Sequence, residues 1–311
     1  MNPPADHGVR WRLIGFALSA TGSLLFALKG ILIKLIYVYG IDTSALLAIR
    51  MGLSLPVFAG VGLYEWYRRP PAGRPDGKSI GLAATVGILG YHCSSWLDFE
   101  GLQTLEAQTE RLILFTYPFL VIIFGRMIFG HRLRAHALGG AGLAYAGLAV
   151  MFGAEPARLN PSMLTGAMFV FGAAATFALY QLFARELILR CGPALFTAVA
   201  MSAASVSLIA QFLLTRDFGD LAAPAPAWRL MVALAIFSTV VPTFLMSAGT
   251  ARIGAQGTAI ISTVSPLLTI ILAVAILAEP FGWPEAVGTL LVIGGTGLFT
   301  LIETRSQRRA R

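Results

Sequence analysis

Five ionisable side chains lie inside long apolar stretches of the chain, where charge is costly and therefore informative. They are Lys29, Arg50, Asp98, Glu110 and Arg111. On insertion scales a charge in a bilayer costs at least about 2.5 kcal/mol, so it normally faces a partner or an aqueous cavity. We expect Asp98 and Glu110 to hold the three bases and to leave about one positive charge for a carboxylate or phosphate. The alternative is that these charges only tie helices together.

Glu110 and Arg111 are neighbours in the segment Ala107–Pro118. Successive side chains on a helix point about 100° apart, so the two cannot both face one groove. We therefore expect one of them to face a solute pathway and the other to brace a neighbouring helix.

The elements that must position these charges occur twice. A shift of 148 positions, without gaps, superimposes these pairs: Gly101 and Gly249, Ala107 and Ala255, Gln108 and Gln256, Pro118 and Pro266, Gly140 and Gly288, Gly147 and Gly295. In the second copy Thr258 and Ala259 replace Glu110 and Arg111. The scaffold is thus doubled, whereas the charge chemistry is present once.

The second copy is expected to contribute shape and polarity to a solute pathway. Near the first helix the matching shift is about 151 positions, which places Tyr180 where Lys29 stands. Tyr180 and Gln256 are therefore the expected pathway residues of the second copy. Interhelical hydrogen bonding is the alternative for such polar groups.

Pro118 and Pro266 are expected within helices, where a proline removes a backbone hydrogen bond and causes a kink. Matched kinks would suit a hinge, and the alternative is a static bend that shapes a cavity wall.

Composition identifies a membrane protein. The 311 residues are 57% hydrophobic and 12% charged, against about 25% charged in soluble domains. The net charge of +8 comes from short basic clusters between apolar segments, which set membrane orientation, so nucleic-acid binding is not expected. Two cysteines, Cys93 and Cys191, do not indicate a disulfide framework.

Apolar segment lengths predict an all-α integral membrane protein, because crossing a bilayer takes about 20 apolar residues. The ten predicted transmembrane helices cover residues 13–36, 43–66, 80–102, 105–128, 134–153, 163–189, 193–214, 228–250, 255–278 and 284–302. The chain accordingly divides into an N-terminal tail (1–12), repeat one (13–153), a connecting loop (154–162), repeat two (163–302) and a basic tail (303–311).

The basic loop residues predict the orientation. Arg68, Arg69, Arg74, Lys78 and other basic residues gather on the side of the N-terminus, and only Arg158, Arg216 and Arg229 lie on the other side. The positive-inside rule then places both termini in the cytoplasm and the protein in the cytoplasmic (inner) membrane. Five helices per repeat make the second repeat inverted, with a solute site near the midplane.

Small residues line the fifth and tenth predicted helices, including Gly140, Gly147, Gly288 and Gly295. Such spacing lets helix backbones approach closely in lipid. We expect packing surfaces there, either within the monomer or in a homodimer.

The repeat pattern, the run from Leu28 to Asp42 followed by Leu47–Met51, and Ser265-Pro-Leu-Leu with Glu279-Pro beyond it resemble the EamA family of the drug/metabolite transporter superfamily. One departure is His131, which stands where the second repeat has Glu279. The resemblance implies a ten-helix carrier of small solutes.

We interpret the chain as a secondary transporter, with export as the favoured direction, of a small polar metabolite such as an amino acid or another carboxylate-bearing solute. The alternatives are a membrane-embedded enzyme and a channel or sensor. No catalytic motif, metal-ligand spacing or phosphate-binding loop is present in the sequence, so no catalytic residue, metal or cofactor is expected.

Overall fold

The computed structural model describes residues 5–130, 135–153, 160–262 and 264–309, and side chains over most of these ranges. Every secondary-structure element in these ranges is helical. The first half contains α1 (Ala5–Tyr37), α2 (Thr43–Tyr67), η1 (Pro71–Gly73), α3 (Gly77–Gly87), η2 (Ile88–Cys93), α4 (Ser94–Thr104), α5 (Ala107–Leu114), α6 (Tyr117–Phe129) and α7 (Ala135–Gly153). The second contains α8 (Pro161–Cys191), α9 (Pro193–Thr215), η4 (Phe218–Leu221), α10 (Ala225–Ala235), η5 (Ile236–Val240), α11 (Val241–Ser262), α12 (Ser265–Leu277) and α13 (Trp283–Arg309).

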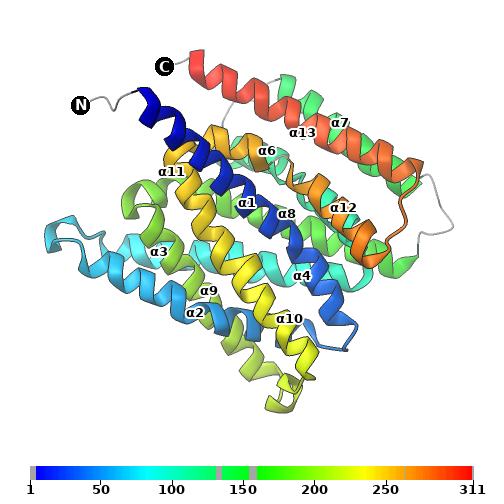
Figure 1. Ribbon diagram of the computed structural model, residues 1–311, viewed down its shortest axis with the longest axis horizontal. Helices are drawn as coiled ribbons and strands as arrows, with labels where there is room; N and C mark the ends of the chain where they lie inside the picture. The colour runs from blue at the N-terminus through cyan, green and yellow to red at the C-terminus, as the bar shows by residue number, and fades with distance from the viewer. Residues whose placement is uncertain (1–4, 131–134, 154–159, 263, 310–311) are drawn as a thin grey trace.

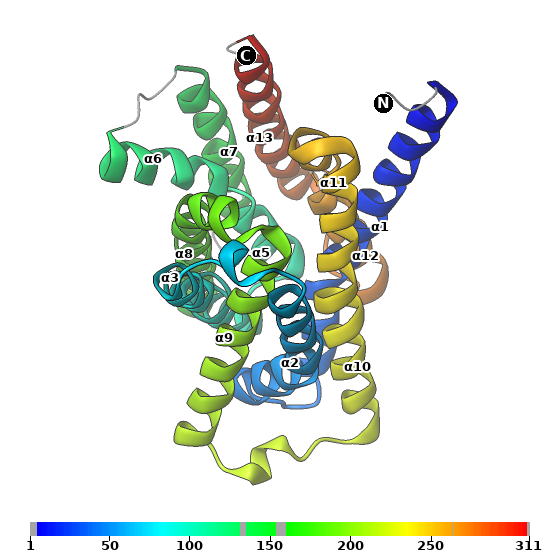
Figure 2. The ribbon, with the colours of Figure 1, turned by 90° about the vertical axis from the view of Figure 1, so that its left-hand side faces the viewer.

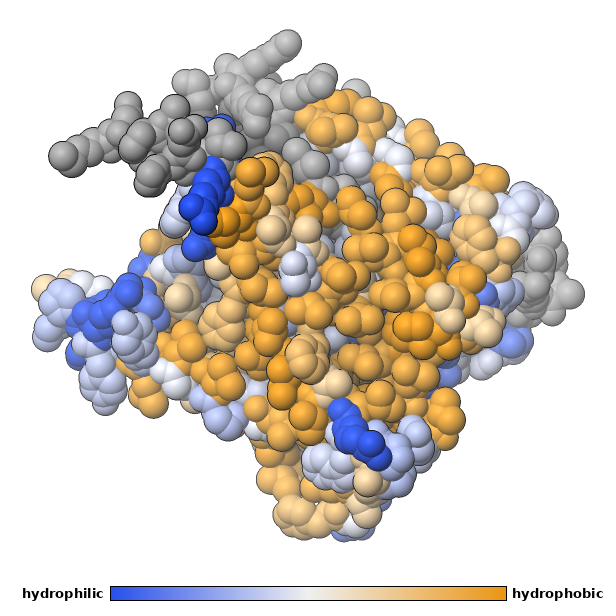
Figure 3. All heavy atoms as spheres, in the orientation of Figure 1, coloured by the Kyte–Doolittle hydropathy of each residue, from blue (hydrophilic) through white to orange (hydrophobic). Residues whose placement is uncertain are grey.

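Eight apolar helical segments of the described chain are long enough to cross a membrane. Two further apolar helices, Leu138–Gly153 and Ser265–Leu277, are shorter than a full span. Figure 3 shows a broad apolar face over α1, α10 and α11, with hydrophilic residues gathered toward the edges. An apolar surface of this extent requires a lipid surrounding, because water-soluble monomers rarely expose large contiguous apolar patches.

Helix starts are fixed by local capping. Asp42 precedes α2, and its Oδ2 accepts a hydrogen bond from the Ser44 amide at 2.9 Å. Asn160 precedes α8, and its Oδ1 accepts from the Met163 amide at 2.7 Å. Each cap satisfies a backbone donor that the first turn leaves unpaired. Gly130 ends α6 with φ of 70°, a left-handed conformation that glycine adopts without strain.

The 148-residue shift found in the sequence also relates the helices. Moved by 148 positions, α3 (Gly77–Gly87) falls on α10 (Ala225–Ala235), and α6 (Tyr117–Phe129) falls on α12 (Ser265–Leu277). The π-helical turns η2 and η5 also begin at equivalent positions, Ile88 and Ile236. The two copies therefore share backbone irregularities as well as residues.

The two copies differ in the helix that precedes Glu110 and Arg111. The first has a break at Leu105 and Glu106, between α4 and α5, where both residues are extended. In the second, α11 is continuous from Val241 to Ser262. The predicted break between helices 228–250 and 255–278 was therefore wrong, and the equivalent position lies inside one helix.

Both prolines lie at helix starts rather than in helix interiors, which corrects the sequence prediction. Pro118 is in the first turn of α6 and Pro266 in the first turn of α12. There a proline costs no hydrogen bond, because the first amides of a helix have no intrahelical acceptor. In the first copy the chain between α5 and α6 turns at Phe115 and Thr116, so any hinge would be centred there and not on the proline itself.

The predicted small-residue faces pack within the monomer. Helices α7 and α13 lie side by side in Figures 1 and 2. A Cβ added at Gly140 would meet the Gly295 carbonyl oxygen at 2.8 Å, and one added at Gly147 would meet the Gly288 carbonyl oxygen at 2.7 Å. These four glycines are used between α7 and α13, and a homodimer through other small residues of these helices stays a prediction.

The first helix of each copy packs against the other copy. Helix α1 contacts α11 and α12, and α8 contacts α4 and α6. The start of α1 and the end of α13 lie on the same side of the molecule (Figures 1 and 2). We call this side the terminal end, and the opposite side, which holds Tyr37 and Glu279, the distal end. This exchange of helices places the space between the copies at the centre of the molecule.

Candidate functional site

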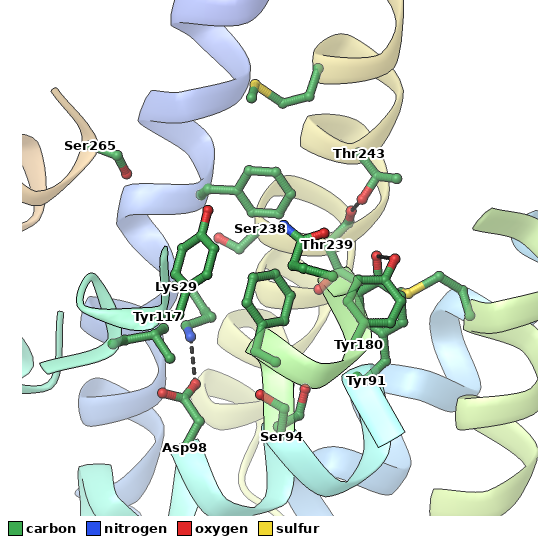
Figure 4. Close-up of a pocket in the computed structure, with 18 of the residues that line it drawn as sticks. Lys29, Tyr91, Ser94, Asp98, Tyr117, Tyr180, Ser238, Thr239, Thr243 and Ser265 are labelled. Atoms are coloured by element: carbon green, nitrogen blue, oxygen red, sulfur yellow. Dashed lines mark hydrogen bonds and ion pairs between the residues drawn. The ribbon is translucent and has the colours of Figure 1, made fainter. Parts of the chain in front are cut away.

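A cavity of about 470 Å³ lies between the two copies. Its lining combines charged groups, hydroxyl groups and aromatic rings from both copies. The charged members are Lys29, Arg50, Asp98 and Arg111, and the hydroxyl-bearing members include Ser94, Ser95, Thr197, Ser238, Thr239, Thr243 and Ser265. Figure 4 shows Lys29 and Asp98 on one side of the cavity and the paired Tyr91 and Tyr180 on the other.

The two π-helical turns form matching parts of the wall. Gly90 and Tyr91 of η2 line the cavity, and so do Ser238 and Thr239 of η5, which are their equivalents after the 148-residue shift. A π-helical turn is a costly irregularity that occurs frequently at functional sites. Sequence analysis did not find these turns, because no residue type specifies an added residue in a helix. The signal in the sequence that points to these turns is that Gly90 and Ser238 occupy equivalent positions in the two copies.

Lys29 is held by both acids of the site. Its Nζ lies 2.5 Å from Asp98 Oδ2 and 3.4 Å from Glu110 Oε1. Both acids are buried, and Glu110 lies behind Lys29 rather than on the cavity wall. Two carboxylates on one ammonium compensate its buried charge, whereas removing one partner of such a pair leaves the other unpaired.

Arg50 has no carboxylate partner within 4.0 Å among the described side chains. Its Nη2 donates to Ser95 Oγ at 3.2 Å, and its guanidinium carbon lies 4.7 Å from the centre of the Phe99 ring. Its buried Nε has no hydrogen-bond partner. The prediction that the acids hold all three bases was therefore wrong for Arg50.

Arg111 is in the same situation on α5. Its Nη2 donates to Ser265 Oγ at 2.6 Å, across the boundary between the copies, and its buried Nε has no partner. Again no carboxylate of the described residues pairs with it. Arg111 lines the cavity while Glu110 points to Lys29, as the 100° difference between neighbouring positions requires.

The second copy contributes hydroxyl oxygens that accept hydrogen bonds. Ser238 Oγ donates to the Leu25 carbonyl at 3.1 Å, Thr239 Oγ1 to the Leu234 carbonyl at 3.2 Å, and Thr243 Oγ1 to the Thr239 carbonyl at 2.6 Å. Because each hydroxyl proton is already used, the oxygen lone pairs remain for a solute. The wall of the first copy thus supplies the guanidinium donors and the Asp98 carboxylate, and that of the second supplies hydroxyl acceptors.

Tyr180 lies in the cavity wall where the repeat comparison placed it. Its hydroxyl is 2.9 Å from that of Tyr91, and the two ring centroids are 5.0 Å apart. Phe177 stacks on Tyr180 at 5.5 Å and meets Tyr117 edge to face at 5.0 Å. These rings form an apolar wall beside the polar groups.

The remaining predicted site residues lie outside the cavity or outside the description. The side chain of Gln256 lies outside the described residues. Thr258, the counterpart of Glu110, contacts Ser19 and Thr250 at the interface of α1 and α11. Cys93 and Cys191 are free thiols.

Comparison with known proteins decides the family. The model of the EamA-like transporter family matches residues 13–153 and 164–301, which together make up most of the chain. The chain belongs to the EamA-like transporter family. This family is part of the drug/metabolite transporter superfamily, as the sequence resemblance predicted.

Relatives of this EamA-like transporter carry the same general description. The uncharacterized transporter YcbK of Bacillus subtilis (strain 168) is 31% identical over 318 aligned positions, covering 100% of this chain and 98% of YcbK. The uncharacterized transporter YyaM of the same organism is 25% identical, covering 81% of this chain and 82% of YyaM. Both point to a membrane transporter rather than an enzyme.

A solved crystal structure, titled only as that of a protein, shares the fold. It matches with a TM-score of 0.63 at 20% identity, covering 96% of this chain and 98% of the other. At this identity the likeness supports the fold alone.

Proposed function

We propose that this EamA-like transporter is a secondary carrier that exports a small polar solute bearing a carboxylate, such as an amino acid. The solute binds in the central cavity between two inverted repeats, residues 13–153 and 163–302. The carrier alternates between states open to either side of the cytoplasmic membrane, and both termini are cytoplasmic.

The observation that carries this proposal is the pair of guanidiniums without a carboxylate partner in one cavity. Arg50 and Arg111 each use one nitrogen on a serine and keep a buried Nε unpaired. Asp98 attracts both guanidiniums only at a distance, so a bound carboxylate would supply the charge-assisted hydrogen bonds that they lack. The charge sum of the five residues, three bases and two acids, also leaves one positive charge for an anionic group.

A second set of contacts favours a solute that also carries a donor such as an ammonium or hydroxyl group. Asp98 Oδ1 is buried and has no partner, while Oδ2 binds Lys29. The oxygens of Ser238 and Thr239 face the same cavity with their protons already used. A donor on the solute would form hydrogen bonds with these acceptors. Buried acceptors without a hydrogen bond are costly.

The proposed orientation rests on the basic residues. The basic residues at the terminal end include Arg68, Arg69 and Arg74, whereas few basic residues of the described chain lie at the distal end. The positive-inside rule therefore assigns the distal end to the outside of the cell. The equivalent positions of α3 with α10 and of α6 with α12 support two related halves. An inverted arrangement of these halves would supply alternating access around one central site.

Binding can be tested by a thermal-shift screen on the purified protein, because a ligand of the folded state raises its melting temperature. The panel pairs amino acids with their amides, hydroxy acids and phosphate. We expect carboxylates to raise the melting temperature of the parent, amides to have no effect, and both Arg50→Gln and Arg111→Gln to lose the response. Arg190→Gln, at an exposed pair with Glu186, is the matched control and should respond like the parent. A response that both cavity variants retain would contradict the proposed site.

Transport is tested separately in liposomes. A carrier predicts saturable flux and exchange of labelled for unlabelled solute, whereas a channel would pass ions without such exchange. Exchange that does not saturate would remove the carrier mechanism. The protein can be inserted in both orientations, and its preferred direction then follows from the initial rates.

A further inference from the structure

Glu279, outside the cavity, binds the start of α5. Its Oε1 accepts from the Ala107 amide at 2.6 Å and its Oε2 from the Gln108 amide at 3.1 Å. The residue that precedes α5, Glu106, makes no side-chain cap of its own. The first amides of a helix have no intrahelical acceptor and carry partial positive charge. A carboxylate there stabilises the helix by accepting their hydrogen bonds and by its negative charge. Glu279 of the second copy therefore caps a helix of the first.

Lys34 binds the other side of the same break. Its Nζ donates to the Leu102 carbonyl at 3.2 Å and to the Leu105 carbonyl at 2.9 Å, which are acceptors left free at the end of α4. In addition, Gln108 Nε2 donates to the Pro280 carbonyl at 2.8 Å. The two helix ends that meet at Leu105 and Glu106 are thus fixed by α1 and by the loop after α12.

This contact is continuous with the candidate site. Helix α5 has only eight residues, and Glu110 and Arg111 lie two and three positions after Gln108 along it. Glu110 binds Lys29, and Arg111 lines the cavity. A displacement of α5 at its start would therefore displace both site residues, because a helix this short moves as one body.

The equivalent place in the second copy is built differently. The 148-residue shift pairs Glu279 with His131, whose structure lies outside the described residues, and α11 has no break there. Helix α4 packs against α1 at the distal end. Their counterparts α11 and α8 are not a closely packed pair in the described part of the chain. Among the residues that the structure describes, the closing contacts are therefore concentrated at the distal end.

We propose that Glu279 and Lys34 form a latch that holds the distal end of the cavity closed. Glu279 is a positioning residue: it fixes α5 and, through α5, Glu110 and Arg111. Opening the distal end requires the start of α5 to leave Glu279 and the end of α4 to leave Lys34. The inference goes beyond the proposed function, since it concerns which contacts close the cavity and not which solute occupies it.

The test measures access to the cavity from the distal side and needs no solute. A single reporter cysteine replaces Thr197, a cavity-lining residue outside both the latch and the charged cluster, in a protein that lacks Cys93 and Cys191. A membrane-impermeant maleimide is added on the distal side of sealed vesicles. We expect slow labelling in the parent and about tenfold faster labelling in Glu279→Ala, the scale expected for the loss of a helix cap.

The matched control is Glu285→Ala. Glu285 Oε2 accepts from the Gly282 amide at 2.7 Å, so it also caps a helix start, but that of its own helix α13. Its removal should leave distal labelling within about twofold of the parent, because this cap does not hold α5. Labelling that rises equally in Glu285→Ala and Glu279→Ala would mean general loosening and would overturn the latch.

Two further variants keep the test decisive if Glu279→Ala does not fold. Glu279→Gln retains one acceptor oxygen and Lys34→Met removes the contact with α4, and either should raise distal labelling. Folding is checked by the melting temperature. Folded variants of both residues that label as slowly as the parent would refute the latch. That result would leave the proposed carrier function untouched, because solute binding at Arg50 and Arg111 is measured independently.

Discussion

The two walls of the cavity lie at equivalent places in the two copies but present different chemistry. The wall of the first copy presents the guanidiniums of Arg50 and Arg111, which only donate hydrogen bonds. The wall of the second copy presents Ser238, Thr239 and Thr243, whose oxygens are left to accept them. A symmetric scaffold thus encloses an asymmetric site. A solute with an anionic end and a donor end would have one preferred orientation in it.

The largest effect is expected from removing the ammonium that holds the two acids. Lys29→Met leaves Asp98 and Glu110 buried without an ion-pair partner and should lower the stability of the folded protein by about 3–5 kcal/mol. Adding Glu110→Gln should restore part of the melting temperature, because only one buried carboxylate then lacks its partner. A Lys29→Met protein as stable as the parent would show that the cluster is not a stabilising unit.

Removal of acceptors on the second wall should have a smaller effect. Ser238→Ala with Thr239→Val should weaken binding of an amino acid by about fivefold to 100-fold, since each of the two net hydrogen bonds contributes about 0.5–1.5 kcal/mol. The corresponding solute without its amino group should bind both proteins equally. If that solute lost as much affinity, the hydroxyl groups would shape the cavity rather than accept from the solute.

The smallest effect on affinity is expected at the two prolines. Because both occupy first turns, Pro118→Ala and Pro266→Ala should change solute affinity by less than about twofold. Slower exchange between the two open states would still indicate a hinge at the preceding turn. Unchanged exchange rates in both variants would assign the turns a static role.

Sequence could predict the features that depend on composition and repetition. The apolar segments, the 148-residue shift and the gathering of Lys29, Arg50, Asp98 and Arg111 around one space follow from spacing alone. The pairing within that cluster could not be predicted, because it depends on how helices rotate against each other. Both acids form ion pairs with Lys29, whereas neither cavity arginine forms an ion pair with a described carboxylate.

The break after α4 was predicted, between helices 80–102 and 105–128, but the contact that holds it was not. It is capped by Glu279, which is 172 positions away from Ala107. The same local pattern in the second copy forms a continuous helix. A helix end that is fixed by a distant side chain leaves no periodicity or capping signal of its own.

The central claim, that Arg50 and Arg111 bind the carboxylate of the solute, is tested most directly by a calorimetric cycle. The cycle compares an amino acid found to bind the parent with its amide, on the parent and on Arg111→Gln. If the guanidinium binds the carboxylate, the parent should prefer the acid by about 30-fold or more, the scale of a buried charge-assisted contact. This preference should fall to a few-fold in Arg111→Gln. An equal preference for the acid in both proteins would contradict the account.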